Sequence, residues 1–140
     1  MASDPAGLHS QAQALSNAMT KMHRDKYGRG PNSVRTVMGH DHVICFLEDI
    51  YTPVERTLIE AGRFPAVKET RSAFQDTMED KFSASVEELS GRKVIGFLSQ
   101  VHVDPDLAVE TFILEPSSDG QPAIGEVTGD EQPDELPSER

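Results

Sequence analysis

The sequence predicts an α+β domain in which a four-stranded antiparallel or mixed sheet is packed by an N-terminal helix and by one short and one long central helix. Apolar residues recur at spacings of three and four in two segments, which is typical of amphipathic helices, and a third segment opens with a helix-capping sequence. Two further regions each hold a pair of short apolar segments joined by a tight polar turn, which is typical of β-hairpins. The predicted order of elements is therefore α-β-β-α-α-β-β.

The first helix is expected from about Asp4, which can cap it ahead of Pro5, to Tyr27. Its apolar stripe consists of Leu8, Ala12, Leu15, Met19 and Met22. This stripe can pack on the sheet of the same domain, or it can pair with a second copy in a homodimer or with a partner helix. We expect a homo-oligomer, a dimer through this first helix.

The loop "GRGP", residues 28–31, follows the first helix. It is too short for a Walker loop and precedes a strand, so it does not predict a nucleotide site. Gly28 can end the helix in a left-handed conformation, and Pro31 stiffens the entry to the strand. Arg29, exposed beside Gly30, is a candidate for contact with an anion or an acidic partner.

The first hairpin pairs residues 33–39 with residues 42–48. Its second strand is apolar on both faces, so we expect it to lie centrally in the sheet or to be covered on two sides. Cys45, within this strand, is expected to be a buried and inert thiol. The turn carries His40 and His42, which are too few ligands for a closed zinc site, so we predict no metal site.

The short central helix has a clear start signal. Thr52 can cap it, Pro53 suits its first position, and Glu55 can complete a capping box. The long helix is expected over about residues 66–90, with Gly91 placed to end it. Its stripe consists of Val67, Arg71, Phe74, Met78, Phe82, Val86 and Leu89.

Arg71 is unusual because it falls on the apolar stripe of the long helix. A buried guanidinium needs partners that compensate its charge. It either pairs with a buried carboxylate such as Glu55, or it presents a charge at a binding surface.

The second hairpin pairs residues 93–103 with residues 107–115 through a turn at 104–106. We predict one domain over residues 1–115. Residues 116–140 hold seven acidic side chains against one basic side chain, with many Pro, Gly and Ser residues. They are expected to form an acidic, disordered tail.

Composition excludes several function classes. The formal net charge is −11 and no segment is rich in Lys and Arg, which disfavours nucleic acid as a partner. The chain has neither an apolar run of about 18 to 20 residues nor a signal-peptide start, and its one cysteine fits a reducing compartment, so we expect a cytoplasmic protein that does not insert into the membrane. No nucleophile elbow or activated thiol is visible, so we expect neither an enzyme nor a cofactor.

The ordered set of "GRGP", "LEDIYTPVERTL", Arg71, "GRKV" and "TFILE" resembles the MpsC-like domain family, long a domain of unknown function. The resemblance covers about residues 15–115. The matching positions are Gly28, Gly30, Pro31, Leu47, Thr52, Glu55, Leu58, Arg71, Gly91, Arg92 and Val94. The family often has Ser-Asp where this chain has Ser99-Gln100, and the resemblance supplies no catalytic residue.

The resemblance implies a cytosolic protein associated with a sodium-translocating, membrane-potential-generating system that has a proton-pump-like subunit and a link to inorganic carbon. We therefore expect a non-enzymatic accessory or regulatory subunit of a bacterial ion or inorganic-carbon transport system. It would dock on an integral membrane subunit through the first helix and Arg29, Arg71 and Arg92. The alternative is a soluble sensor whose arginines bind a carboxylate, phosphate or bicarbonate.

Overall fold

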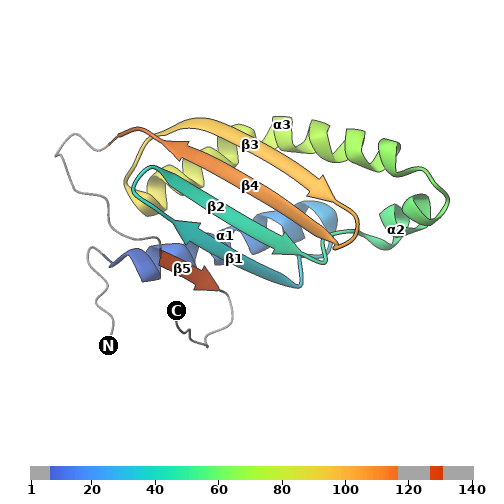
Figure 1. The fold of residues 1–140 in the computed structure, drawn as a ribbon, viewed down its shortest axis with the longest axis horizontal. Coiled ribbons are helices and arrows are strands. Elements are labelled where there is room, and N and C mark those ends of the chain that lie inside the picture. The colour runs from blue at the N-terminus through green and yellow to red at the C-terminus, as the bar shows by residue number, and fades with distance from the viewer. Residues whose placement is uncertain (1–6, 117–126, 131–140) are drawn as a thin grey trace.

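The computed structural model describes residues 7–116 and 127–130, which form an antiparallel sheet with helices packed on one face (Figure 1). The helices are α1 (Leu8–Tyr27), α2 (Pro53–Glu60) and α3 (Phe64–Ser90). The strands are β1 (Ser33–Met38), β2 (His42–Glu48), β3 (Val94–His102), β4 (Leu107–Leu114) and β5 (Val127–Asp130). The predicted α+β class and the order of the first seven elements are confirmed, and β5 is added to them.

The predicted helix boundaries rest on local backbone chemistry that the structure contains. Gly28 ends α1 and Gly91 ends α3, each in the left-handed conformation with φ of 81° and 72°. At the start of α2, the Thr52 side chain accepts a hydrogen bond from the Glu55 backbone N–H, and the Glu55 carboxylate accepts one from the Thr52 backbone N–H. The capping box is therefore confirmed, whereas the predicted cap at Asp4 lies outside the described residues.

The strand order across the sheet is β3-β4-β2-β1-β5, with every neighbouring pair antiparallel. The apolar strand β2 is the middle strand, which confirms its predicted central place. One face of the sheet is covered by α1 and α3, and both helices lie behind the sheet in Figure 1. The core lies between these two layers.

The apolar stripe of α1 packs inside this domain. Leu15 and Met19 are fully buried, and Leu8 and Met22 pack against the same core. The helix contacts β1, β5 and α3. A dimer through this stripe would require α1 to leave the sheet, because the same side chains fill the core of one chain. The expected homo-oligomer stays a prediction.

Strand β5 lies in the segment that the sequence predicts to be a disordered tail. It pairs with β1 at the edge of the sheet and is covered by α1. A Cβ atom at Gly129 would lie 2.3 Å from the Gln13 backbone nitrogen, so only glycine allows this close approach. Ser16 of α1 donates a hydrogen bond of 2.6 Å to the Gly129 carbonyl. This contact is tertiary, so the composition of the tail did not predict it.

The other face of the sheet is not covered by any described element. Its two central rows, read from the strand register, consist of Leu98, Thr111, Ile44 and Val37, and of Gln100, Val109, Phe46 and Arg35. We call these eight residues the open face. Leu98 is 62% exposed, Ile44, Phe46 and Val109 are half-buried by their neighbours, and Val37 is buried at 9% exposure. The Arg35 guanidinium lies 4.4 Å above the Phe46 ring.

The contact between Gly129 and α1 predicts that Gly129→Ala destabilises the domain by about 1 to 3 kcal/mol, because the added methyl group overpacks against the helix backbone. Urea unfolding measures this change. Gly96→Ala is the matched control, since a Cβ atom there meets only Ile113 side-chain carbons at 3.4 Å. Equal stability of the two variants would contradict the placement of β5.

Candidate functional site

Arg71 is held in the interior by a carboxylate and a carbonyl. Its side chain is 1% exposed. Nε donates to Glu55 Oε2 at 2.7 Å, and Nη2 donates to Glu55 Oε1 at 2.5 Å and to the Ile50 carbonyl at 2.9 Å. The bidentate pairing compensates the buried charge. Of the two alternatives that the sequence left open, the pair with Glu55 is confirmed.

Two tyrosine rings enclose the same guanidinium. Its central carbon lies 3.8 Å from the centre of the Tyr27 ring and 5.4 Å from that of Tyr51. Burial raises the pKa of both phenols to about 12. The Tyr51 hydroxyl donates to the His102 carbonyl at 3.0 Å, which joins one of these two rings to the end of β3.

Glu55 serves both the helix cap and the ion pair. Burial alone would raise the pKa of its carboxyl group, but the hydrogen bonds from Arg71 and from the Thr52 backbone outweigh burial and lower that pKa below its ordinary value of 4.5. The carboxylate is therefore ionised at neutral pH and pairs with Arg71 as a charged group.

Arg29 binds the same stretch of chain as Arg71. It donates to the carbonyls of Asp49 and Tyr51, both at 2.9 Å, and to the Asp49 carboxylate at 3.2 Å. Asp49 has a positive φ of 58°, and its carboxylate is also bound by Arg56. Three successive carbonyls, at residues 49–51, are thus bound by two arginines. A Cβ atom added at Gly30 would lie 3.3 Å from the Thr20 carbonyl oxygen. Gly30 therefore allows the loop to return close to α1.

Arg92 lies at the other end of the sheet. It donates to the carbonyls of His40 at 2.7 Å and Glu115 at 2.8 Å, which joins the β1–β2 turn to the end of β4. The structure therefore brings Arg29 and Arg71 together and leaves Arg92 apart from them. All three guanidinium groups contact oxygen atoms of the chain itself.

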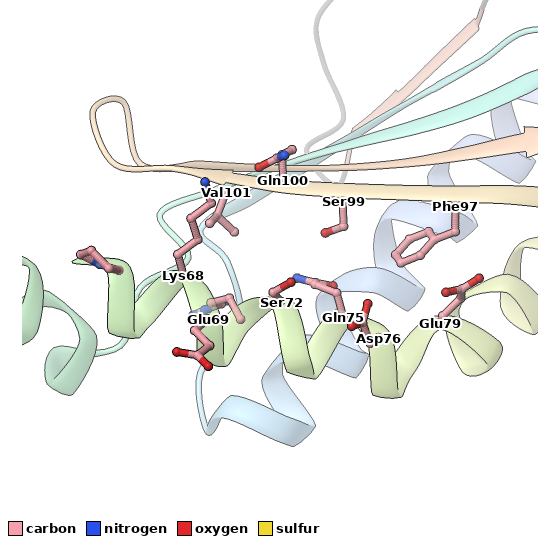
Figure 2. A pocket seen from close by; sticks show the side chains of 12 residues that line it. Lys68, Glu69, Ser72, Gln75, Asp76, Glu79, Phe97, Ser99, Gln100 and Val101 are labelled. Carbon is pink, nitrogen blue, oxygen red and sulfur yellow. The ribbon is translucent and has the colours of Figure 1, made fainter. Parts of the chain in front are cut away.

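A groove of about 440 Å³ runs between α3 and β3 (Figure 2). The residues that line it are Pro65, Lys68, Glu69, Arg71, Ser72, Gln75, Asp76, Glu79, Phe97, Ser99, Gln100 and Val101. In Figure 2, Ser99 points from the strand toward the helix that carries Gln75. The sequence did not predict this groove.

A cluster of buried polar side chains lies beside the groove. Glu110 is fully buried, and His23 and Gln75 are 3% and 5% exposed. Ser99 lies in the same cluster. Six polar atoms of these four residues have no hydrogen-bond partner among the described residues: His23 Nε2, both amide atoms of Gln75, Ser99 Oγ and both carboxylate oxygens of Glu110. A signal for this cluster exists in the sequence, because Glu110 alternates with Ala108 and Phe112 on the buried side of a strand.

The remaining candidates for chemistry are accounted for locally. Burial raises the pKa of the Cys45 thiol to about 12, so it stays protonated at neutral pH, as expected for an inert buried thiol. His42 contacts the Asp41 carboxylate at 2.8 Å in the β1–β2 turn. Within residues 7–116 and 127–130, no three His, Cys, Asp or Glu side chains are grouped to hold a metal ion.

Fold and site define a two-layer α+β domain built around a buried arginine. The family described as "Na+-translocating membrane potential-generating system (MpsC)" matches residues 9–116, and the chain belongs to this family. The predicted membership is thereby confirmed.

The chain is also similar to an uncharacterized protein, YrhF, of Bacillus subtilis (strain 168). The two are 22% identical over 123 residues, which covers 81% of this chain and 95% of that protein. No solved structure matches the chain. Of the helices in the described part of the chain, none has the length and apolar character needed to cross a membrane.

The buried ion pair predicts that Arg71→Met destabilises the domain by about 3 kcal/mol or more, because Glu55 would be left as an uncompensated buried charge. Urea unfolding measures the loss. Arg56→Met is the control: Arg56 is 47% exposed and pairs with Asp49 and Asp106, so its loss should cost about 1 kcal/mol or less. Similar losses in both variants would show that Arg71 is not the central contact.

The lowered pKa of Glu55 predicts an acid-dependent loss of stability. Since the folded state binds this proton less readily than the unfolded state, the contribution of Glu55 is present above pH 4.5 and is lost as pH falls through the lower folded-state pKa. Glu55→Gln should therefore flatten the dependence of unfolding free energy on pH below 4.5. Glu60→Gln, on the exposed side of the same helix, should leave the wild-type slope in place; an unchanged slope for Glu55→Gln would refute the assignment.

Proposed function

We propose that the protein is a non-enzymatic accessory subunit of a bacterial membrane system that transports ions or inorganic carbon. We further propose that it works at the cytoplasmic side and docks on an integral membrane subunit through the open face of its sheet. The description of its family, a sodium-translocating membrane-potential-generating system, supports the setting. The open face is the observation that carries the docking role.

The open face has the composition of an interface core. Six of its eight side chains carry no charge and are apolar or threonine, and Arg35 is its one charged residue. The whole chain, by contrast, has a formal net charge of −11. Depletion of charge at the centre of a surface patch, with aromatic and aliphatic residues present, is the compositional mark of a protein contact.

The occupant that fits this surface is an apolar segment of a partner protein. A lipid surface is a poor alternative, because anionic headgroups repel a protein of this charge. Strands about 4.8 Å apart and several residues long give the sheet a footprint of roughly 500 Å². That area is of the order needed for a specific but reversible complex, which buries about 800 Å² of accessible surface per partner.

The docking surface in this proposal differs from the arginine-based surface that the sequence suggested. Arg29, Arg71 and Arg92 donate hydrogen bonds to oxygens of the chain, and α1 packs on the sheet. A partner or an anion would meet guanidinium groups that already bind the chain, and that of Arg71 is only 1% exposed. The proposal of an anion sensor has the same weakness, because it relies on the same guanidinium groups.

The test is affinity capture of the tagged full chain from detergent-solubilised membranes of its own cells. We expect recovery of an integral membrane transport subunit, and we expect Leu98→Glu to weaken that recovery about tenfold or more. Val54→Glu is the matched control, since Val54 is 70% exposed on α2, away from the open face. Phe46→Glu, at the centre of the face, gives a second reading.

Equal recovery by Leu98→Glu, Phe46→Glu and wild type would overturn the proposed docking surface. Recovery of further copies of the same chain alone, with a dimer in light scattering that Leu98→Glu abolishes, would assign the open face to self-association. That result would also reject the docking role.

A further inference from the structure

We propose that the groove between α3 and β3 binds a small organic molecule that carries a primary ammonium group. The ammonium group would contact Gln75 and Ser99, with the Glu110 carboxylate behind them as its counter-charge. This site lies on the helix-covered side of the sheet and shares only Gln100 with the open face. The inference therefore goes beyond the docking role and does not depend on it.

The first observation is a row of polar residues that crosses the sheet beneath the helices. The strand register places Ser99 opposite Glu110, Glu110 opposite Cys45, Cys45 opposite Thr36, and Thr36 opposite Gly129. The side chains of Ser99, Glu110, Cys45 and Thr36 lie on the face of the sheet that α1 and α3 cover. One end of the row meets α1, and the other end opens on the groove at Ser99.

Near α1, the polar side chains of the row hydrogen-bond to one another and to the backbone. Ser16 donates its one hydroxyl hydrogen to the Gly129 carbonyl at 2.6 Å. The Thr36 hydroxyl, 2.8 Å from Ser16 Oγ, must then be the donor in that pair, and the Cys45 thiol at 3.5 Å is left as the donor to Thr36. The thiol hydrogen is thereby directed away from Glu110.

The end of the row near the groove is not satisfied by the described chain. Both oxygens of Glu110, both amide atoms of Gln75 and Ser99 Oγ have no partner among residues 7–116 and 127–130. Buried polar atoms normally have a hydrogen-bond partner, and leaving them without one is costly. Gln75 and Ser99 also line the groove, and their polar atoms are closed to water, so a bound molecule would meet them after these two side chains turn toward it.

Most of the unsatisfied atoms at the groove call for a donor: both Glu110 oxygens and Gln75 Oε1 accept, Ser99 Oγ can accept, and Gln75 Nε2 is the one that donates only. His23 Nδ1 lies 2.8 Å from the Met19 carbonyl, and it must carry a hydrogen to bond that oxygen. Nε2 lies 3.8 Å from Glu110 Oε2, which is too far for a hydrogen bond, so His23 leaves both Glu110 oxygens without a donor. A protonated amine offers three donors and a positive charge, which matches this arrangement.

The walls of the groove fit an organic cation better than an anion or a bare metal ion. Glu69, Asp76 and Glu79 on its helix wall outnumber Lys68, and the charge of Arg71 is already compensated by Glu55. A volume of about 440 Å³ lies in the range of small-molecule sites and is far larger than one ion needs. Phe97 and Val101 supply apolar surface for a hydrocarbon chain.

The test uses the full chain labelled with nitrogen-15 and titrated with 1,4-diaminobutane. We expect shifts of the Gln75 side-chain amide and the Ser99 backbone amide that saturate. The uncharged analogue 1,4-butanediol, sodium chloride at matched ionic strength and sodium phosphate should leave these signals in place. Glu110→Gln should weaken diamine binding about tenfold or more, while Glu115→Gln, an exposed carboxylate at the end of β4, should retain it.

Gln75→Leu gives an independent reading if Glu110→Gln does not fold, and it should also abolish the Ser99 shift. Absence of saturable shifts with the diamine would overturn the proposal. Equal shifts with butanediol, sodium ion or phosphate would overturn the ammonium assignment, as would full binding by a folded Glu110→Gln or Gln75→Leu protein.

Discussion

The buried guanidinium of Arg71 is the contact on which the arrangement of the helices depends. A charge with 1% exposure must be compensated, and its partners come from the α2 cap at Glu55 and the carbonyl of Ile50. Arg29 binds the carbonyls on either side of Ile50. The two arginines therefore fix the path of residues 49–51, which sets where α2 begins and how α3 lies across the sheet.

That arrangement gives the sheet two different faces. The covered face holds the apolar core and the polar row, whose hydrogen bonds are complete at α1 and incomplete at the groove. The other face presents Leu98, Ile44 and Phe46 without a described element over them. A single scaffold thus separates a surface suited to a protein partner from a groove suited to a small cation, and α3 forms one wall of that groove.

The sequence predicted the helices and the two hairpins, because these follow from periodicity and capping residues. The Arg71–Glu55 pair was one of two alternatives for Arg71, suggested by the cost of a buried charge. The sequence did not predict β5, since four residues in an acidic, glycine-rich segment form a strand only through contact with α1. The groove and the free polar atoms around Glu110 depend on how α3 lies against β3, which no local pattern contains. Arg29 and Arg92 were expected to be exposed for a partner, but nearby carbonyl oxygens bind them.

Site-specific photo-crosslinking in intact membranes tests most directly whether the open face contacts a membrane partner. A photoreactive residue is placed at Leu98 on the open face and, in a separate protein, at Val54 on α2; both positions are exposed. The account predicts a crosslink to an integral membrane transport subunit from Leu98 and none from Val54. No crosslink from Leu98, or an equal yield from both positions, would contradict the claim that the open face is where this protein meets its membrane partner.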